Sequence, residues 1–317
     1  MNAKKCRHIP AMLIKAALVL LLCAVLGTTA MADEPKVNTL TLHCTYDGTA
    51  LEGIRFRMYR TATRTEGDVF VPDAPFDTYP VSQNFYTQNQ WDKAALTLKG
   101  YAQQDHITPL TFGSTDKNGE IVFEELPDGL YLVTGTTVEK DGYRYDIAPF
   151  FITLPADDPV DGTEIRNAQT APKLQRTDVS PQPATVTRKV LKIWDDAGHQ
   201  KDRPKETAVY LLRDGELYDT VILNAQNNWR YTWDALPDGS DWSVTEKPLP
   251  GYTVLIAKEG ITYTVTNTVN TPAAPDKPSE EPKLPQTGQL WWPVWTMGAL
   301  GLLFLLWGLA RRKEEAI

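Results

Sequence analysis

Three polar residues in the C-terminal half of this 317-residue chain stand where β-strands are expected to face a hydrophobic core. Alternate residues of a strand share a face, so each has apolar neighbours on its own side: Lys192 is grouped with Val190 and Trp194, Glu246 with Trp242 and Val244, and Asn267 with Ile261, Tyr263, Val265 and Val269. A buried charge is unfavourable unless it is paired or neutralised. The pattern therefore predicts that the three side chains meet. A register offset by one residue is the alternative, and it would place each of them in solvent.

A lysine, a glutamate and an asparagine in one dry site can form an amide bond. Burial disfavours charge, so proton transfer from Lys192 to Glu246 leaves a neutral amine beside a carboxylic acid. The neutral amine is a nucleophile, the acid can polarise the Asn267 carbonyl and help ammonia leave, and folding supplies the proximity. Such a reaction happens once per molecule and is a maturation step.

The strands that would carry these residues belong to a pattern that occurs twice. The segment 118–133 contains Leu-Pro-Asp-Gly between two alternating runs, and 228–244 repeats this outline. Pro pre-sets one turn angle and Gly accepts a positive one, so each copy reads as strand, turn and strand. We therefore predict a mainly β protein with two tandem immunoglobulin-like or transthyretin-like β-sandwich domains, at 37–168 and 185–270.

Within the second domain, four short motifs resemble those of Cna B-type domains: Lys192-Ile193-Trp194-Asp195-Asp196, Trp242-Ser243-Val244-Thr245-Glu246, Pro250-Gly251-Tyr252 and Thr264-Val265-Thr266-Asn267-Thr268. In that family a lysine and an asparagine form an intramolecular isopeptide bond with the help of an acidic residue. The resemblance implies that Lys192 is the nucleophile, Asn267 the electrophile and Glu246 the proton shuttle.

The first domain resembles a more divergent Cna B or transthyretin-like relative, for which we expect no crosslink. Cys44 falls near the lysine position and Gly135 falls at the glutamate position, although Asn167 could stand in the closing strand. Both partners of the asparagine are thus missing, and Cys44 is expected to be a buried free thiol.

Two segments of the first domain depart from the strand pattern. Apolar residues recur at spacings of three and four residues from Trp91 to Ala102, which predicts a helical insertion near 91–105. The segment 69–90 is a long loop with three prolines and five aromatic residues. Such a loop could recognise a ligand, or its aromatic residues could pack as a lid on the core.

Composition limits what lies outside the two domains. The segments 169–184 and 271–283 are rich in proline and are expected to be a linker and a spacer.

The net charge of −8 gives no basic footprint for nucleic acid.

The N-terminal segment 1–32 is typical of a signal peptide. Basic residues precede an apolar core at 16–26, and Ala30-Met31-Ala32 supplies a cleavage site before Asp33. The full chain has three cysteines, and removal of this segment would leave only Cys44. The exported chain would therefore have no intrachain disulfide.

The C-terminal segment has three parts in a fixed order. The pentapeptide Leu284-Pro285-Gln286-Thr287-Gly288 precedes an apolar run at 290–310, which is long enough for a transmembrane helix, and a basic-led tail at 311–317. This order resembles the sorting signal of Gram-positive surface proteins, in which sortase cleaves after the threonine. The resemblance implies that Thr287 is transferred to peptidoglycan or to a pilin subunit, so that the protein is secreted, contacts the membrane only before sorting and ends covalently anchored to the cell wall. A simple membrane anchor is the alternative.

Two function classes follow from these features. The chain can be an ancillary or basal pilin-type subunit, in which Lys173 after Pro172 is the nearest match to a polymerising lysine. Lys173 lacks the aromatic residue and the asparagine that usually flank such a lysine in pilins, which favours a solvated linker lysine. It can instead be a stand-alone adhesin whose first domain binds a host or matrix ligand.

The histidines left after export, His43, His106 and His199, have no nucleophile or metal spacing, so we expect no turnover enzyme, no metal and no cofactor.

Overall fold

The structure is a computed structural model that describes residues 36–65, 69–179, 185–196 and 198–270. The predicted signal peptide, the spacer 271–283, the pentapeptide and the apolar run 290–310 with its basic tail lie outside these residues. Within the described part of the chain, no helix is long and apolar enough to cross a membrane. The described fold is mainly β with one long helix, as the sequence predicted.

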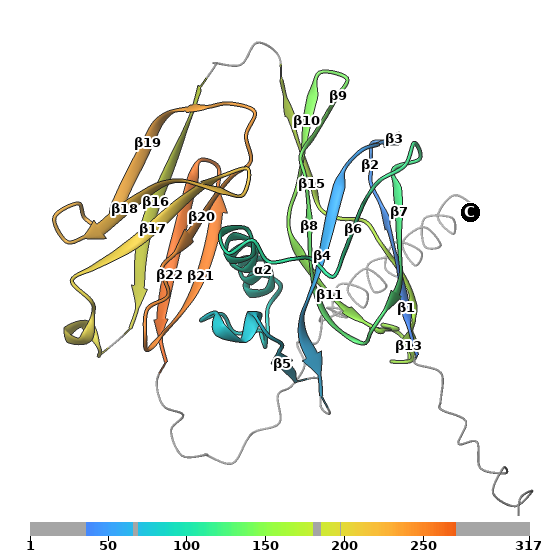
Figure 1. The fold of residues 1–317 in the computed structure, drawn as a ribbon, viewed down its shortest axis with the longest axis horizontal. Helices are drawn as coiled ribbons and strands as arrows, with labels where there is room; N and C mark the ends of the chain where they lie inside the picture. Colours follow the sequence, from blue (N-terminus) through green and yellow to red (C-terminus); the bar gives the residue numbers. More distant parts are fainter. Residues whose placement is uncertain (1–35, 66–68, 180–184, 197, 271–317) are drawn as a thin grey trace, which may run out of the picture. The chain divides into compact units, whose positions relative to one another are not determined.

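Two sheets enclose the core of the first sandwich (Figure 1). In spatial order the smaller sheet is β14 (Asn167–Thr170), β1 (Asn38–His43) and β7 (Glu120–Leu126), with β1 parallel to β14 and antiparallel to β7. The larger sheet is β11 (Phe150–Leu154), β8 (Gly129–Gly135), β4 (Arg55–Arg64) and β5 (Phe70–Pro72), and β6 (Thr111–Ser114) also pairs with β4. Leu40 and Leu42 of β1 and Phe56 and Met58 of β4 are fully buried between these sheets because alternate residues point inward.

Shorter strands surround this sandwich. A three-stranded sheet has the order β15 (Leu174–Asp178), β10 (Tyr143–Ile147) and β9 (Val138–Lys140), and two small pairs join β2 (Thr45–Tyr46) to β3 (Thr49–Ala50) and β12 (Ala156–Asp157) to β13 (Glu164–Ile165). Strand β15 lies inside the segment predicted to be a linker. The sequence did not reveal this pairing because the partner strand β10 is about thirty residues away and the bonds use only backbone groups.

The predicted helix is α2 (Gln88–Gln104), which begins three residues before the predicted start. Thr87 is its N-cap and forms a capping box with Gln90, which fixes where the helix begins. The preceding loop contains a short 3-10 helix, η1 (Phe76–Thr78). Four of its five aromatic residues pack against α2 or the core, and one is exposed: Phe70 and Phe85 contact Trp91, Tyr79 stacks on Tyr101, Phe76 is buried, and Tyr86 faces solvent. The loop is therefore mostly a lid on the core.

The second sandwich also consists of two sheets (Figure 1). One has the order β19 (Arg230–Pro237), β16 (Thr185–Asp195), β22 (Thr262–Val269) and β21 (Tyr252–Glu259), and the other has the order β18 (Glu216–Asn224), β17 (Glu206–Arg213) and β20 (Trp242–Glu246). A short 3-10 helix, η2 (Gln200–Asp202), lies between β16 and β17. The first and last strands, β16 and β22, are parallel neighbours. Residues far apart in the sequence, near 192 and 267, are therefore adjacent.

Candidate functional site

Lys192, Glu246 and Asn267 lie together in the core of the second sandwich. Their exposed fractions are 4%, 1% and 1%. They come from β16, β20 and β22 and so from both sheets, and Lys192 Nζ lies 3.9 Å from Glu246 Oε1. In the β16–β22 register, Lys192 is opposite Val265 and Trp194 is opposite Asn267, so Lys192 and Asn267 are diagonal neighbours. The predicted inward orientation of all three side chains is confirmed.

The Lys192 amine is held between backbone oxygens and an indole ring. Nζ donates a hydrogen bond to the Ile193 carbonyl at 2.9 Å and lies 3.5 Å from the Val265 carbonyl. It also lies 4.0 Å from the centre of the Trp194 ring. These contacts hold the amine against β22 at Val265, two residues before Asn267.

The Asn267 side chain is buried without satisfying its hydrogen-bonding groups. Neither Nδ2 nor Oδ1 has a partner within hydrogen-bonding geometry, although the amide is close enough to lower the pKa of Glu246. An unsatisfied buried amide is unfavourable by about 1–3 kcal/mol. Such a group contributes little to stability as it stands, which suits a residue that reacts.

The surroundings favour the uncharged forms of the lysine and glutamate. Burial lowers the pKa of Lys192, and the nearby carboxylates of Glu246 and Asp196 only partly oppose this. Burial also raises the pKa of Glu246, against the opposing effects of Lys192, Asn267 and Thr207. Both shifts bring the two pKa values closer together, which makes proton transfer from the amine to the carboxyl group easier. The site can thus present a nucleophilic amine beside a general acid.

Three residues near the site were not predicted. Thr207 Oγ1 donates a hydrogen bond to Glu246 Oε1 at 3.0 Å. Arg203 donates to both carboxyl oxygens of Asp196 at 2.6 and 2.5 Å, and Asp196 is itself buried. Thr207 could have been found from the sequence, since it is a polar residue on the same strand face as buried apolar side chains at 209 and 211.

The corresponding place in the first sandwich is apolar. The backbone N–H of Cys44 donates to the Gly119 carbonyl as that of Lys192 donates to the Trp229 carbonyl, so the two residues are structurally equivalent. A Cβ atom on Gly135 would lie 2.9 Å from Phe56 and 3.0 Å from Ile147.

Asn167 and Cys44 also lack the arrangement of a crosslinking site. Asn167 is exposed, and burial raises the pKa of the Cys44 thiol to about 12. Cys44 is the free buried thiol that the sequence predicted.

Lys173 lies apart from this site. Its side chain is 67% exposed, and Nζ lies 2.8 Å from Asp92 of α2. Among the described residues, no group of three or more His, Cys, Asp or Glu side chains is placed to hold a metal ion.

One stretch of the chain is similar in sequence to a known adhesin. Over 86 residues the chain is 35% identical to the collagen adhesin of Staphylococcus aureus, a stretch that covers 25% of this chain and 7% of that protein.

Two solved structures are similar at low identity. A single B repeat unit of the collagen-binding surface protein of Staphylococcus aureus matches at 18% identity and a TM-score of 0.27, over 75% of this chain and all of that one. The major pilin SpaD of Corynebacterium diphtheriae matches at 17% identity and a TM-score of 0.30, over 76% and 66% of the two chains. Because both TM-scores are low, neither structure bears on function here. Residues 188–268, which include Lys192, Glu246 and Asn267, match the family of Cna protein B-type domains.

Proposed function

We propose that this chain is a sortase-anchored surface protein, an ancillary or basal pilin-type subunit, whose second sandwich forms an isopeptide bond between Lys192 and Asn267. The observation that carries this proposal is the buried Lys192–Glu246 pair beside an amide that has no hydrogen-bond partner. The match of residues 188–268 to Cna B-type domains supports it.

The proposed reaction is an intramolecular transamidation. Neutral Lys192 Nζ attacks Asn267 Cγ while protonated Glu246 donates a hydrogen bond to Oδ1. A Nζ–Cγ bond forms and the Cγ–Nδ2 bond breaks. Glu246 gives its proton to the leaving nitrogen and takes one from Nζ, so one ammonia is released and the carboxylic acid is regenerated. The reaction occurs once, which makes the chain a self-modifying protein rather than a turnover enzyme.

Intact mass spectrometry of the exported chain tests this reaction. The protein should be lighter than its processed sequence by one ammonia, and Lys192→Ala, Glu246→Ala and Asn267→Ala should each restore the full mass. Asn270→Ala, an exposed position at the end of β22, is the matched control. A folded wild-type chain with its full mass would refute the bond and the three roles.

The proposed anchoring depends on Leu284, Pro285, Gln286, Thr287 and Gly288. Sortase would cleave after Thr287 and join it to peptidoglycan or to a pilin subunit. Thr287→Ala should move the protein out of the detergent-resistant wall fraction. Normal retention of that variant in the wall would contradict sortase anchoring.

The second candidate is a stand-alone wall adhesin that binds a host or matrix ligand through its first domain. The 35% identity of an 86-residue stretch of the chain to a collagen adhesin favours it. A blot of wall extract separates the two candidates, because a polymerising subunit gives a ladder of high molecular weight and a lone adhesin gives one band. Loss of a ladder in Lys173→Ala would assign Lys173 as the polymerising amine, and an unchanged ladder would exclude it.

A further inference from the structure

Helix α2 belongs to the first sandwich but covers the edge strands of both sheets of the second. It contacts β20, which carries Glu246, and β21, which pairs with β22. The hydrophobic core is continuous across this contact, since Leu98 and Tyr101 of α2 belong to the same buried cluster as Val244 and Val265 of the second sandwich. The wall on this side of the crosslinking site therefore comes from the other domain.

The first sandwich supplies hydrogen bonds that the edge strand β21 would otherwise lack. The N–H of Ile256 donates to Thr97 Oγ1, and the N–H of Val254 donates to the Pro80 carbonyl, each at 2.8 Å. An exposed edge strand normally leaves such groups to water or to another chain. Here residues of the first sandwich cap them.

Tyr101 makes the contact closest to the reacting groups. Its hydroxyl donates to the backbone carbonyl of Glu246 at 2.9 Å, and it is near enough to the Glu246 carboxyl group for that charge to raise its own pKa, after the larger effect of burial. Tyr101 is 1% exposed, so its ring and this hydrogen bond are shielded from bulk water. It fixes the main chain of the proposed general acid without touching the amine or the amide.

Gly100 allows the helix to approach this closely. A Cβ atom there would lie 3.1 Å from the Val244 carbonyl oxygen and 3.3 Å from Thr245 Cβ. A large side chain at this position has no room and would push α2 away from β20.

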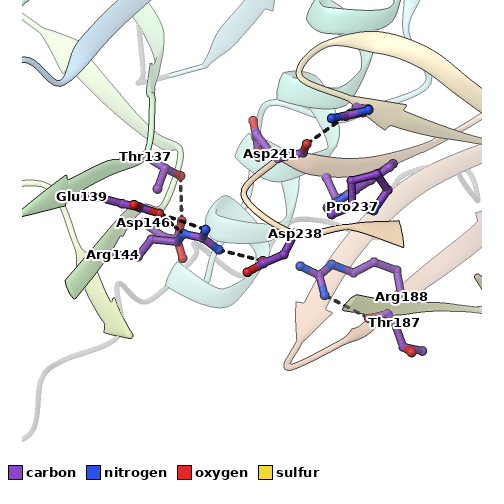
Figure 2. Close-up of polar contacts among 12 residues, drawn as sticks. Thr137, Glu139, Arg144, Asp146, Thr187, Arg188, Pro237, Asp238 and Asp241 are labelled. Carbon is purple, nitrogen blue, oxygen red and sulfur yellow. Dashed lines mark hydrogen bonds and ion pairs between the residues drawn. The ribbon is translucent and has the colours of Figure 1, made fainter. Parts of the chain in front are cut away.

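Charged pairs hold the same face at its rim. Arg144 of β10 lies 3.1 Å from Asp238 in the Leu-Pro-Asp-Gly turn of the second sandwich (Figure 2). Lys99 Nζ of α2 lies 2.8 Å from Asp241 Oδ2. Gln103 Oε1 also accepts a hydrogen bond from Ser243 Oγ of β20. The contact is thus apolar at its centre and polar at its edge, as in a specific interface.

We infer that α2 of the first sandwich is a working part of the crosslinking site in the second: it excludes water from Lys192 and Glu246, and Tyr101 is a positioning residue for Glu246. The inference rests on the proposed isopeptide bond. It predicts that the second sandwich crosslinks at its full rate only after the first sandwich has docked. The bonds made and broken are those of the transamidation above.

The test follows loss of one ammonia by intact mass spectrometry during cell-free synthesis of the full chain. Tyr101→Phe should slow the reaction several-fold, and Gly100→Leu should slow it by about tenfold or more because a displacement near 1 Å is enough to misalign reacting groups. Tyr86→Phe removes a tyrosine hydroxyl and Asn89→Leu introduces a leucine, each at an exposed position, and both should leave the rate unchanged. Wild-type rates in both Tyr101→Phe and Gly100→Leu overturn the inference while leaving the crosslink in place. A wild-type chain that never loses ammonia refutes the crosslink itself.

A second measurement reports water exclusion directly. In an Asn267→Ala background no bond can form, and the ¹³C shift of the Glu246 carboxyl carbon distinguishes acid from carboxylate. Because burial raises the pKa of Glu246, the acid fraction at a given pH should be larger with α2 docked than in Gly100→Leu. Hydrogen exchange at Ile256 and Val254 confirms undocking, and exchange at Val190 confirms that the sandwich remains folded. If Gly100→Leu does not fold, the same carboxyl shift is measured in Tyr101→Phe, which removes only one oxygen atom from the contact. An acid fraction that is unchanged by undocking at every pH contradicts the inference.

Discussion

At the residue scale, one hydroxyl determines where the proposed general acid sits. Thr207 is 3% exposed and donates its hydrogen bond to Glu246 Oε1, which fixes one carboxyl oxygen in a place where water cannot do so. Asp196, paired with Arg203, is close enough to the Lys192 amine to oppose the effect of burial on the pKa of Lys192. The Lys192–Glu246 pair is thus tuned by residues that do not react.

Removal of the Thr207 hydroxyl should slow the crosslink. Thr207→Val keeps the shape of the side chain but leaves Glu246 Oε1 without its donor, and we expect loss of ammonia to be slower by about tenfold because the carboxyl group is less well oriented. The mass-spectrometric time course measures this. Thr207→Ser retains the donor and should remain near the wild-type rate, and equal rates for Val and Ser would contradict a positioning role for the hydroxyl.

At the element scale, β20 is buried on both faces. Strand alternation predicts that Trp242, Val244 and Glu246 point inward, and they do, but Ser243 and Thr245 are buried as well. Helix α2 covers them, and its N-terminal end depends on the capping box of Thr87 and Gln90. The helix is thus the element through which the first sandwich stabilises the second.

Loss of the helix cap should weaken the fold. Thr87→Ala removes a hydrogen bond to the backbone N–H of Gln90, and N-cap substitutions of this kind lower the free energy of unfolding by about 1 kcal/mol. Denaturant unfolding of the crosslink-free Asn267→Ala chain measures the change. Thr87→Ser should restore most of the stability, and an unchanged unfolding midpoint in Thr87→Ala would show that the cap contributes nothing.

At the scale of the whole molecule, the two sandwiches share a core, and the proposed bond joins the first and last strands of the second. Those strands are parallel neighbours. With the proposed bond between them, tension along the domain would pass through covalent bonds. The polar rim of the shared face includes the ion pair Arg144–Asp238 (Figure 2) and the ion pair Lys99–Asp241.

Absence of the crosslink should lower stability without changing the fold. The bond would close a loop of about 75 residues, which on the chain-entropy model used for disulfides restricts the unfolded chain by about 4 kcal/mol. Asn267→Ala should therefore have a lower Tm and faster proteolysis, with an unchanged circular dichroism spectrum. Asn270→Ala should behave as wild type. Equal Tm values for wild type and Asn267→Ala would contradict a stabilising role.

The interface between the sandwiches should loosen in acid. Burial alone would raise the pKa of Asp238 and Asp241, but hydrogen bonds from Gly239 and Arg144 to Asp238, and the charge and hydrogen bond of Lys99 at Asp241, lower both pKa values below the ordinary 3.8. A lowered folded pKa means that these pairs contribute fully above about pH 3.8 and lose that contribution as the pH falls through the lowered values.

Hydrogen exchange at the capped amides of Val254 and Ile256 measures this loosening. Protection should fall below about pH 4 in the wild-type chain. A chain carrying both Asp238→Asn and Asp241→Asn should show weaker protection at neutral pH and a smaller loss in acid. The same loss of protection in the variant as in the wild type would exclude these two carboxylates as its cause.

The sequence by itself determined the features that depend on local geometry. Strand alternation is a property of the backbone, so the inward positions of Lys192, Glu246 and Asn267 follow from their apolar neighbours. The helix near 91–105 followed in the same way from its period, and the repeated Leu-Pro-Asp-Gly outline marked a strand, a turn and a strand in both sandwiches.

Only the tertiary structure decided which distant surfaces meet. The pairing of β15 with β10, the packing of the aromatic loop on α2, and the hydrogen bond from Thr207 to Glu246 each join segments tens of residues apart. The burial of both faces of β20 is the clearest case, because a residue such as Thr245 reads as a solvent-facing strand position until α2 covers it. Alternation is encoded within one strand, whereas the partner that covers its second face is chosen by the packing of the whole chain.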